Sequence, residues 1–139
     1  GRVRERGKGM GEGYTINLPV LAGSGDDIFL RSISFFCKKI QEFHPDYLAI
    51  SAGFDGYSED QLLDLNYSIG SFQQVGLLLG NLKVPTFGVL EGGYHAKVKD
   101  CLDALIQGFY LKKPCSELTT STEAAQNHLT NVINTHNAL

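Results

Sequence analysis

Residues 47–60 read YLAISAGFDGYSED and pass from a short apolar run into a polar, acidic loop. The apolar run has the length and the residue types of a buried strand. A second run of this kind, TFGVL, occupies residues 86–90. Between the two, residues 68–80 place apolar side chains at helical spacing, and Ser68 stands where an N-cap is expected. A strand, a helix and a strand in this order predict two parallel strands joined by a helical crossover.

The flanking sequence continues the same alternation. Apolar residues recur at spacings of three and four over residues 29–43, which predicts a helix, and Ser24 and Asp27 resemble a capping box at its start. Residues 14–18 alternate apolar and polar, as in a short strand, and residues 98–109 again show helical spacing. We therefore expect an α/β fold in which a parallel sheet is covered by helices on both faces.

The length of 139 residues suits one domain, within which three segments differ in composition. Residues 1–13 form a Gly-rich basic loop, residues 14–112 form the α/β part, and residues 113–139 form a polar tail. The tail either forms one weakly amphipathic helix or is partly ordered, and its sequence leaves both alternatives open.

Charge and composition exclude several classes of protein. The formal net charge of −3 argues against direct binding to a nucleic-acid backbone. Hydrophobic residues make up 42% of the chain, a globular balance, but no apolar run approaches the roughly 20 residues that a membrane-spanning helix needs. The three cysteines are far apart, which indicates reduced thiols in a cytoplasmic protein rather than a disulfide framework or a zinc finger.

Open parallel sheets bind ligands beyond the carboxyl ends of their strands, and this rule selects two loops. The loop at residues 52–60 contains three carboxylates, and the loop at residues 91–95 contains two glycines, a tyrosine and a histidine. If the strands are neighbours, both loops face one crevice. Carboxylates beside Tyr94 and His95 could hold a metal ion or act in acid–base chemistry. Ordinary turn formation by Asp and Gly is the alternative that these residue types leave open.

Other features of the sequence fit a binding or catalytic site less well. The glycine-rich run at residues 7–13 precedes a strand rather than following one, and therefore fits neither a P-loop nor a dinucleotide-binding loop. His44 lies before its strand, at the wrong edge of the sheet, and is expected to be a helix-end residue. His128 and His136 are expected to be solvated in the tail.

Three motifs together point to a known family. They are GEGYTINLP at residues 11–19, continued by GSGD at residues 23–26; SAGFD at residues 51–55, with Asp60 five residues later; and LEGGY at residues 90–94. With these motifs in this order, the chain resembles the C-terminal part of the histone deacetylase superfamily. The resemblance is closest to the prokaryotic deacetylases, the acetylpolyamine amidohydrolases and the class II enzymes, and it covers about residues 7–110.

The resemblance implies an arginase/deacetylase fold and a set of site residues. Asp60 would be a zinc ligand, and the Tyr94 phenol would hydrogen-bond the carbonyl oxygen of the scissile amide. Gly92 and Gly93 would line the narrow tunnel that receives the acylated side chain. The backbone near Tyr14 resembles a part of the family that helps to hold a structural monovalent cation.

Two neighbouring residues are expected to have lesser roles. Asp55 is expected to be structural and to bind loop amides. His95 is expected either to contact the site residues without itself binding the metal or the substrate, or to be solvated. The chemistry implied by the resemblance is hydrolysis of the amide of an acetylated lysine or an acetylated polyamine. Zinc would polarise that amide and activate a water molecule, and the tyrosine would stabilise the oxyanion.

The family's remaining catalytic groups are an Asp-x-His motif, which supplies zinc ligands, and a His-His pair, which supplies the general base; the sequence contains neither. Because a catalytic zinc site normally has three protein ligands, the chain alone is expected to bind zinc weakly and not to deacetylate. Either it is a fragment of a complete deacetylase, or it is a half that pairs with a separate N-terminal half or with itself. The alternative function is a non-catalytic α/β binding or assembly module that retains the deacetylase scaffold.

Overall fold

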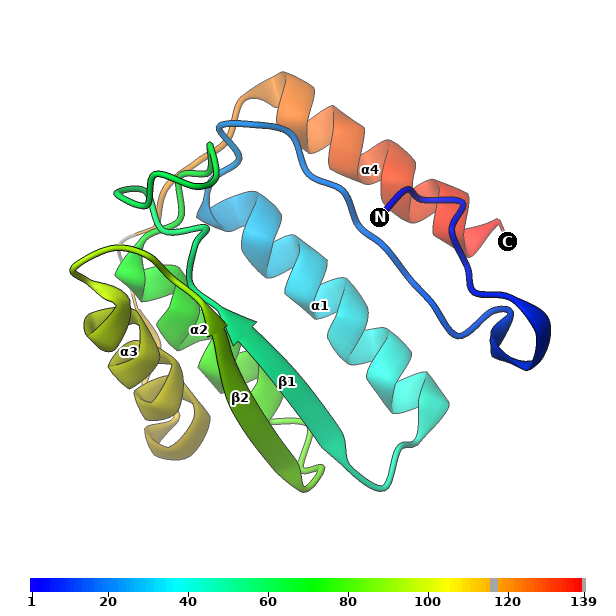
Figure 1. Cartoon of the computed structure of the whole chain (residues 1–139), viewed down its shortest axis with the longest axis horizontal. Coiled ribbons are helices and arrows are strands. Elements are labelled where there is room, and N and C mark those ends of the chain that lie inside the picture. Colours follow the sequence, from blue (N-terminus) through cyan, green and yellow to red (C-terminus); the bar gives the residue numbers. More distant parts are fainter. Residues whose placement is uncertain (116–117, 139) are drawn as a thin grey trace.

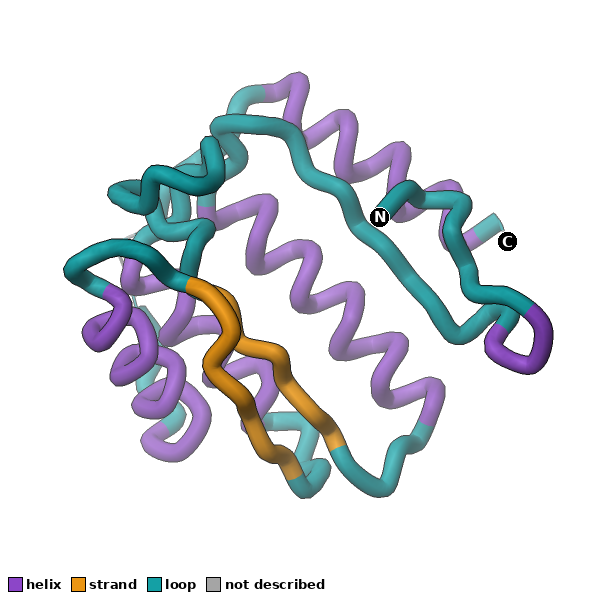
Figure 2. The backbone as a smooth tube through the Cα atoms, in the orientation of Figure 1, coloured by secondary structure: helices purple, strands orange, loops and turns teal. Residues whose placement is uncertain are grey.

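A two-stranded parallel sheet and four α-helices make up the part of the chain that the computed structural model describes, residues 1–115 and 118–138 (Figure 1, Figure 2). In chain order the elements are the 3₁₀ helix η1 (Gly9–Gly11), α1 (Asp26–Phe43), β1 (Leu48–Gly53), α2 (Ile69–Gly80), β2 (Thr86–Gly92), α3 (Val98–Leu111) and α4 (Glu123–Asn137). The alternation of helix and strand predicted between α1 and α3 is therefore confirmed. No helix in the described ranges is long and apolar enough to cross a membrane.

Strands β1 and β2 pair in parallel, and α2 forms the crossover between them, as the sequence predicts. The ladder is regular up to the pair of Ala52 and Leu90, and the next pair is Gly53 and Gly92. Strand β2 therefore has one extra residue, Glu91, at the carboxyl end of the sheet. Irregularities of this kind redirect the chain and are frequent next to functional sites.

Helices α2 and α3 lie side by side behind the strands (Figure 1) and pack closely through glycines. A Cβ atom on Gly76 would stand 2.0 Å from the carbonyl oxygen of Leu105, and one on Gly108 would stand 1.9 Å from the carbonyl oxygen of Gln73. The two helix backbones are therefore closer together than any residue with a side chain at these positions would allow.

These two helices cover one face of the strands. Ile50 and Ala52 of β1 line an apolar cavity together with Leu102 of α3. On the other face, Ala49 and its partner Phe87 are exposed. The α/β class and the parallel sheet are confirmed, and in the described part of the chain the helical cover of the two strands lies on this one face.

The main hydrophobic core lies where β1 ends. Phe54, directly after β1, is 1% exposed and meets Phe72 of α2 with ring centroids 5.1 Å apart. Phe29 of α1 stacks on Tyr67 at 4.3 Å. The other buried members of this core are Tyr57, Cys101 and Ala104. Part of the predicted ligand-binding loop is therefore packed into the core, which fixes its position relative to the sheet.

Helix α1 does not begin with the predicted capping box. Its N-cap residue is Gly25, which lies one position after Ser24. The Ser24 hydroxyl turns back and donates to the Leu21 carbonyl oxygen at 2.7 Å, and the Asp27 carboxylate accepts from the Ile28 amide at 2.8 Å. In a capping box, the Ser24 hydroxyl would accept from the Asp27 amide and the Asp27 carboxylate would accept from the Ser24 amide. The prediction is wrong because both side chains have other partners.

Hydroxyl groups from far along the chain bind the first amides of α1. The Gly25 amide donates to Ser121 Oγ at 2.7 Å, and the Asp26 amide donates to Thr119 Oγ1 at 2.9 Å. The Asp26 carboxylate is fully buried and accepts from the Thr119 amide and from both the amide and the hydroxyl of Ser68, the N-cap of α2. One side chain therefore ties the starts of α1 and α2 to the segment before α4.

Residues 14–18 do not form the predicted strand; the described part of the chain offers them no ladder partner. They belong to an extended segment that runs along α4 (Figure 1). His136 Nε2 lies 2.8 Å from the Asn17 carbonyl oxygen, and His128 Nε2 lies 3.1 Å from that of Pro19. The expectation that these two histidines are solvated is wrong, because α4 presents both to the backbone of this segment.

Of the two alternatives for the tail, a helix and partial order, residues 123–137 adopt the helix. The Thr122 side chain caps α4 by accepting from the Ala125 amide at 3.3 Å. Ala125 and Leu129 are buried against Ile28 of α1. Helix α4 is thus stabilised by the burial of its apolar side chains and not by helix propensity alone.

Candidate active site

The loops that follow β1 and β2 lie together at the carboxyl edge of the sheet. The Phe54 amide donates to the Gly92 carbonyl oxygen at 2.9 Å, just beyond the last ladder pair. Because the strands are parallel neighbours, the expectation that both loops share one edge is confirmed.

Asp60 is 7% exposed, and each oxygen of its carboxylate accepts a backbone amide. Oδ1 accepts from Leu62 at 2.8 Å, and Oδ2 accepts from Tyr94 at 2.7 Å. These amides, with a smaller electrostatic contribution from His95, hold the pKa of the Asp60 carboxyl below its usual range, although burial opposes them. The carboxylate is therefore ionised at neutral pH and held in one orientation.

Tyr94 reaches Asp60 through its backbone amide, whereas the residue as a whole is 70% exposed. The preceding residue, Gly93, has φ +126°, a conformation that residues with a side chain rarely adopt. A Cβ atom on Gly93 would also stand 2.7 Å from Cγ2 of Val98. The turn that presents Tyr94 therefore requires glycine at position 93.

Asp55 lies beside glycines rather than beside amides. In the described ranges no amide donates to its carboxylate, so the expected amide bonds are wrong. A Cβ atom on Gly92 would stand 3.1 Å from Asp55 Oδ2, and one on Gly53 would stand 3.3 Å from its Oδ1. The Asp55 carboxylate fills the space that side chains at these two positions would need.

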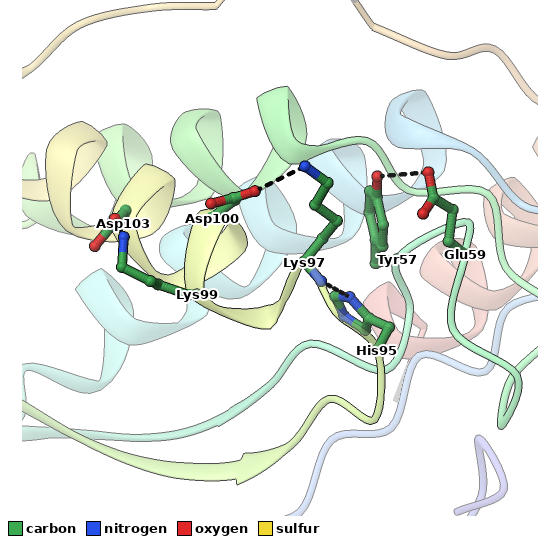
Figure 3. Close-up of polar contacts among 7 residues, drawn as sticks. All are labelled: Tyr57, Glu59, His95, Lys97, Lys99, Asp100 and Asp103. Carbon is green, nitrogen blue, oxygen red and sulfur yellow. Dashed lines mark hydrogen bonds and ion pairs between the residues drawn. The ribbon is translucent and has the colours of Figure 1, made fainter.

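His95 contacts both loops. Its Nε2 lies 3.0 Å from the Phe54 carbonyl oxygen, and its Nδ1 accepts from the Lys97 amide at 3.2 Å (Figure 3). Of the two alternatives for His95, support of the site and solvation, these contacts favour support.

Tyr57 is a site residue that the sequence reasoning missed. Its ring is 8% exposed and lies 4.7 Å from the His95 ring, between centroids, and its hydroxyl donates to Glu59 Oε1 at 3.2 Å (Figure 3). Burial, together with Glu59, raises the pKa of Tyr57. The sequence signal was weak: an aromatic residue inside a loop of mostly polar residues and glycines.

Asp60 has the chemistry of one metal ligand. Carboxylate oxygens bind zinc, and each Asp60 oxygen keeps a lone-pair site beyond its single amide partner. In residues 1–115 and 118–138 no three His, Cys, Asp or Glu side chains stand close enough together to hold a metal ion among them. Asp60 therefore has the ligand type and the free lone pairs that zinc coordination needs, and the described residues place no two further His, Cys, Asp or Glu side chains beside it to complete a site.

A parallel α/β sheet that brings an ionised carboxylate and a tyrosine together at adjacent strand ends has these groups where open sheets of this kind bind their ligands. Residues 1–109 match the family described as "Histone deacetylase domain". The chain belongs to the histone deacetylase superfamily and is similar to its acetylpolyamine amidohydrolases, which confirms the resemblance found in the three motifs.

Similarity to individual proteins agrees with this assignment. The chain is 37% identical over 106 residues to the acetylpolyamine amidohydrolase of Burkholderia pseudomallei, a match that covers 76% of this chain and 30% of that protein. The crystal structure of acetylpolyamine aminohydrolase from Burkholderia pseudomallei superposes with a TM-score of 0.75 at 35% identity, over 78% of this chain and 32% of that one. The HDA15 HD domain superposes with a TM-score of 0.83 at 28% identity, over 100% and 39%. The chain thus spans about a third of the length of these relatives.

Proposed function

We propose that this chain is the C-terminal portion of a zinc-dependent deacetylase that hydrolyses the acetyl amide of an acetylated lysine or polyamine. The observation that carries the proposal is the 2.7 Å hydrogen bond from the Tyr94 amide to the Asp60 carboxylate. It keeps the candidate zinc ligand and the candidate catalytic tyrosine on adjoining loops at one edge of the sheet. The names of the relatives, acetylpolyamine amidohydrolase and histone deacetylase, support this substrate class.

Asp60 serves as the zinc ligand of this portion. When bound, zinc polarises the amide carbonyl and lowers the pKa of its water to about 7. Asp60 contributes an ionised carboxylate to the metal, and its two amide partners, Leu62 and Tyr94, keep that carboxylate in one orientation.

Tyr94 serves as the hydrogen-bond donor to the reacting oxygen. A neutral tyrosine hydroxyl donates at pH 7, and a donor aimed at the developing oxyanion lowers the barrier by about 2.7–4 kcal/mol. Tyr94 is 70% exposed, so a substrate arriving from solvent has access to it. Gly92 and Gly93 line the passage for the acylated side chain, as the resemblance to the deacetylase family implies; they directly precede Tyr94 in the same loop.

The remaining zinc ligands and the general base come from an N-terminal part that contains the Asp-x-His motif and the His-His pair. Exposed apolar side chains that such a part would cover lie on both faces of the strands: Phe87 and Leu90 of β2 are each 58% exposed, and Tyr110 of α3 is 73% exposed. The outer edges of β1 and β2 also have no strand partner in the described part of the chain. A cytoplasmic setting belongs to the proposal, because it keeps buried thiols such as Cys101 reduced.

The test combines the purified chain with the N-terminal part of a deacetylase relative that contains both motifs. We expect the chain alone to hydrolyse neither a fluorogenic acetyl-lysine peptide nor an acetylated polyamine, and the mixture to hydrolyse at least one of them when zinc is added. In the mixture, Tyr94→Phe should lower kcat by about 100-fold or more while the fold is kept. The matched control is Tyr47→Phe at the opposite end of β1, where the ring is 71% exposed; it should leave turnover unchanged.

Two outcomes would overturn parts of the proposal. Turnover by the chain alone would contradict the assignment of the missing ligands to a separate part, and light scattering would then show whether the active species is a monomer or a self-associated form of the chain. A stable but inactive complex of the two parts would favour the alternative, a non-catalytic binding or assembly module.

A further inference from the structure

His95 joins the two loops in a way that the proposed mechanism does not use. The Lys97 amide donates to Nδ1 at 3.2 Å, so Nδ1 is the unprotonated nitrogen of the neutral ring. The ring proton is then on Nε2, which donates to the Phe54 carbonyl oxygen at 3.0 Å. A single tautomer therefore satisfies both ring nitrogens.

Two of the residues that the His95 ring contacts, Phe54 and Tyr57, are themselves held firmly. Phe54 is 1% exposed, and its amide is bound to the Gly92 carbonyl oxygen at 2.9 Å. The Tyr57 ring, 8% exposed, lies against the imidazole, and its hydroxyl is bound to Glu59 (Figure 3). His95 is thus anchored to the core at the end of β1.

Tyr94, the residue before His95, makes the contact that holds the candidate zinc ligand. The Tyr94 amide is bound to Asp60, while the His95 side chain is bound to Phe54 at the start of the same loop. The loop after β2 is therefore fastened to the loop after β1 at two points. The backbone of His95 has a separate role, because its carbonyl accepts from the Val98 amide at 3.3 Å as α3 begins, and any residue could do this.

We infer that His95 is a positioning residue: as the Nε2-protonated tautomer it clamps the Tyr94 loop onto the Asp60 loop, so that the Tyr94 amide stays on the Asp60 carboxylate. The loop contact follows from the geometry alone, whereas its consequence for turnover rests on the proposed function.

The test measures the full chain by NMR at about pH 8. A long-range nitrogen–proton correlation spectrum should show His95 as the Nε2-protonated tautomer. His95→Phe keeps a ring against Tyr57 but has no donor, and we expect it to speed hydrogen exchange of the Tyr94 amide about tenfold. His95→Gln keeps a donor that can reach Phe54, and should hold that exchange within about threefold of the unmodified chain.

The matched control is His128→Phe, which removes another histidine contact to a carbonyl, at 3.1 Å from Pro19, far along the chain from the site. It should leave Tyr94 exchange unchanged. The inference is overturned if folded His95→Phe exchanges Tyr94 at the rate of the unmodified chain, or if the ring is the Nδ1-protonated tautomer. If His95→Phe instead loses protection throughout β1, His95→Gln decides: fast Tyr94 exchange in that variant would also reject the clamp.

In an active reconstituted mixture, His95→Phe should lower kcat about tenfold with KM changed less than about twofold, and His95→Gln should recover most of kcat. An unchanged kcat beside faster Tyr94 exchange would reject the catalytic consequence. An inactive mixture would contradict the proposed function instead, and the exchange result would still decide whether His95 clamps the loops.

Discussion

At the scale of single residues, Asp55 and Asp60 show how position separates two carboxylates of one loop. Asp60 is bound by two amides and stays ionised, whereas the Asp55 carboxylate is packed beside Gly53 and Gly92. The composition of the loop does not indicate which of these carboxylates is the better candidate for a metal ligand. The motif did select Asp60, but the amide of Tyr94 that orients it comes from another loop and has no signature in the sequence around Asp60.

Cys101 leads to a prediction about thiol reactivity. It is fully buried, and burial together with Asp100 raises its pKa to about 11. Because the thiolate is the reactive species, iodoacetamide at about pH 8 should label Cys101 in the folded chain about 100-fold more slowly than in the unfolded chain. Mass spectrometry of the digested protein over time measures both rates.

Cys37 is the internal control for this labelling. Burial raises its pKa too, but the residue is partly exposed, so it should react faster than Cys101 in the folded chain. Equal rates for the two thiols in the folded state would contradict the burial of Cys101.

At the scale of elements, the helices and strands predicted between residues 29 and 109 appear where the sequence places them. Helix α2 begins after Ser68 and α1 ends at Phe43, before Pro45. Residues 14–18 alternate like a strand but form none, because a strand also needs a neighbour to pair with. In the described part of the chain this segment instead contacts α4 through its carbonyl groups.

At the close contact between α2 and α3, we expect replacement of glycine by alanine to destabilise the fold. Replacing glycine by alanine inside a helix normally stabilises it by about 0.5–1 kcal/mol. For Gly76→Ala we expect the opposite, a loss of about 1–3 kcal/mol in the free energy of unfolding, because overpacking forces the helices apart. The new Cβ atom would stand 2.0 Å from the Leu105 carbonyl oxygen. Urea unfolding followed by circular dichroism measures the change.

Gln107→Ala is the control, since Gln107 is exposed on α3 next to the tight contact at Gly108. Its effect should stay within about 0.5 kcal/mol. A Gly76→Ala variant as stable as the unmodified chain would show that the helices are not in close contact.

At the scale of the whole molecule, two adjacent carboxylates join segments that are distant in the sequence. Asp26 binds Ser68 and Thr119, and Asp27 binds Ser121 and Gln126. The start of α1 is thereby connected to α2 and to α4.

The ionisation of Asp27 should make the stability of the fold depend on pH. Burial opposes its ionisation, but hydrogen bonds from Ser121, Ile28 and Gln126 outweigh burial and lower its pKa below 3.8. A carboxyl whose pKa is lower in the folded state stabilises the fold above its unfolded pKa, and this contribution is lost as pH falls through the folded value. The free energy of unfolding should therefore fall steeply below about pH 4. Asp27→Asn should cost about 1–2 kcal/mol at neutral pH and make the acid dependence shallower.

Asp46→Asn is the matched control, because Asp46 is exposed and its carboxylate has no hydrogen bond or ion pair with any residue that the structure describes. Urea unfolding at a series of pH values compares the variants. An acid dependence for Asp27→Asn as steep as that of Asp46→Asn would contradict the role of Asp27.

The sequence by itself determined the β-α-β unit, the three family motifs and the edge of the sheet at which Asp60 and Tyr94 meet. Periodicity and motifs depend on residues a few positions apart, so they are visible in one dimension. Only the tertiary structure decided the hydrogen bond between Asp60 and Tyr94, the contact of His95 with Phe54, and the binding of α1 by hydroxyls near residue 120. These partners are 34, 41 and 96 positions apart, and a polar group that becomes buried binds whichever partner packing brings to it.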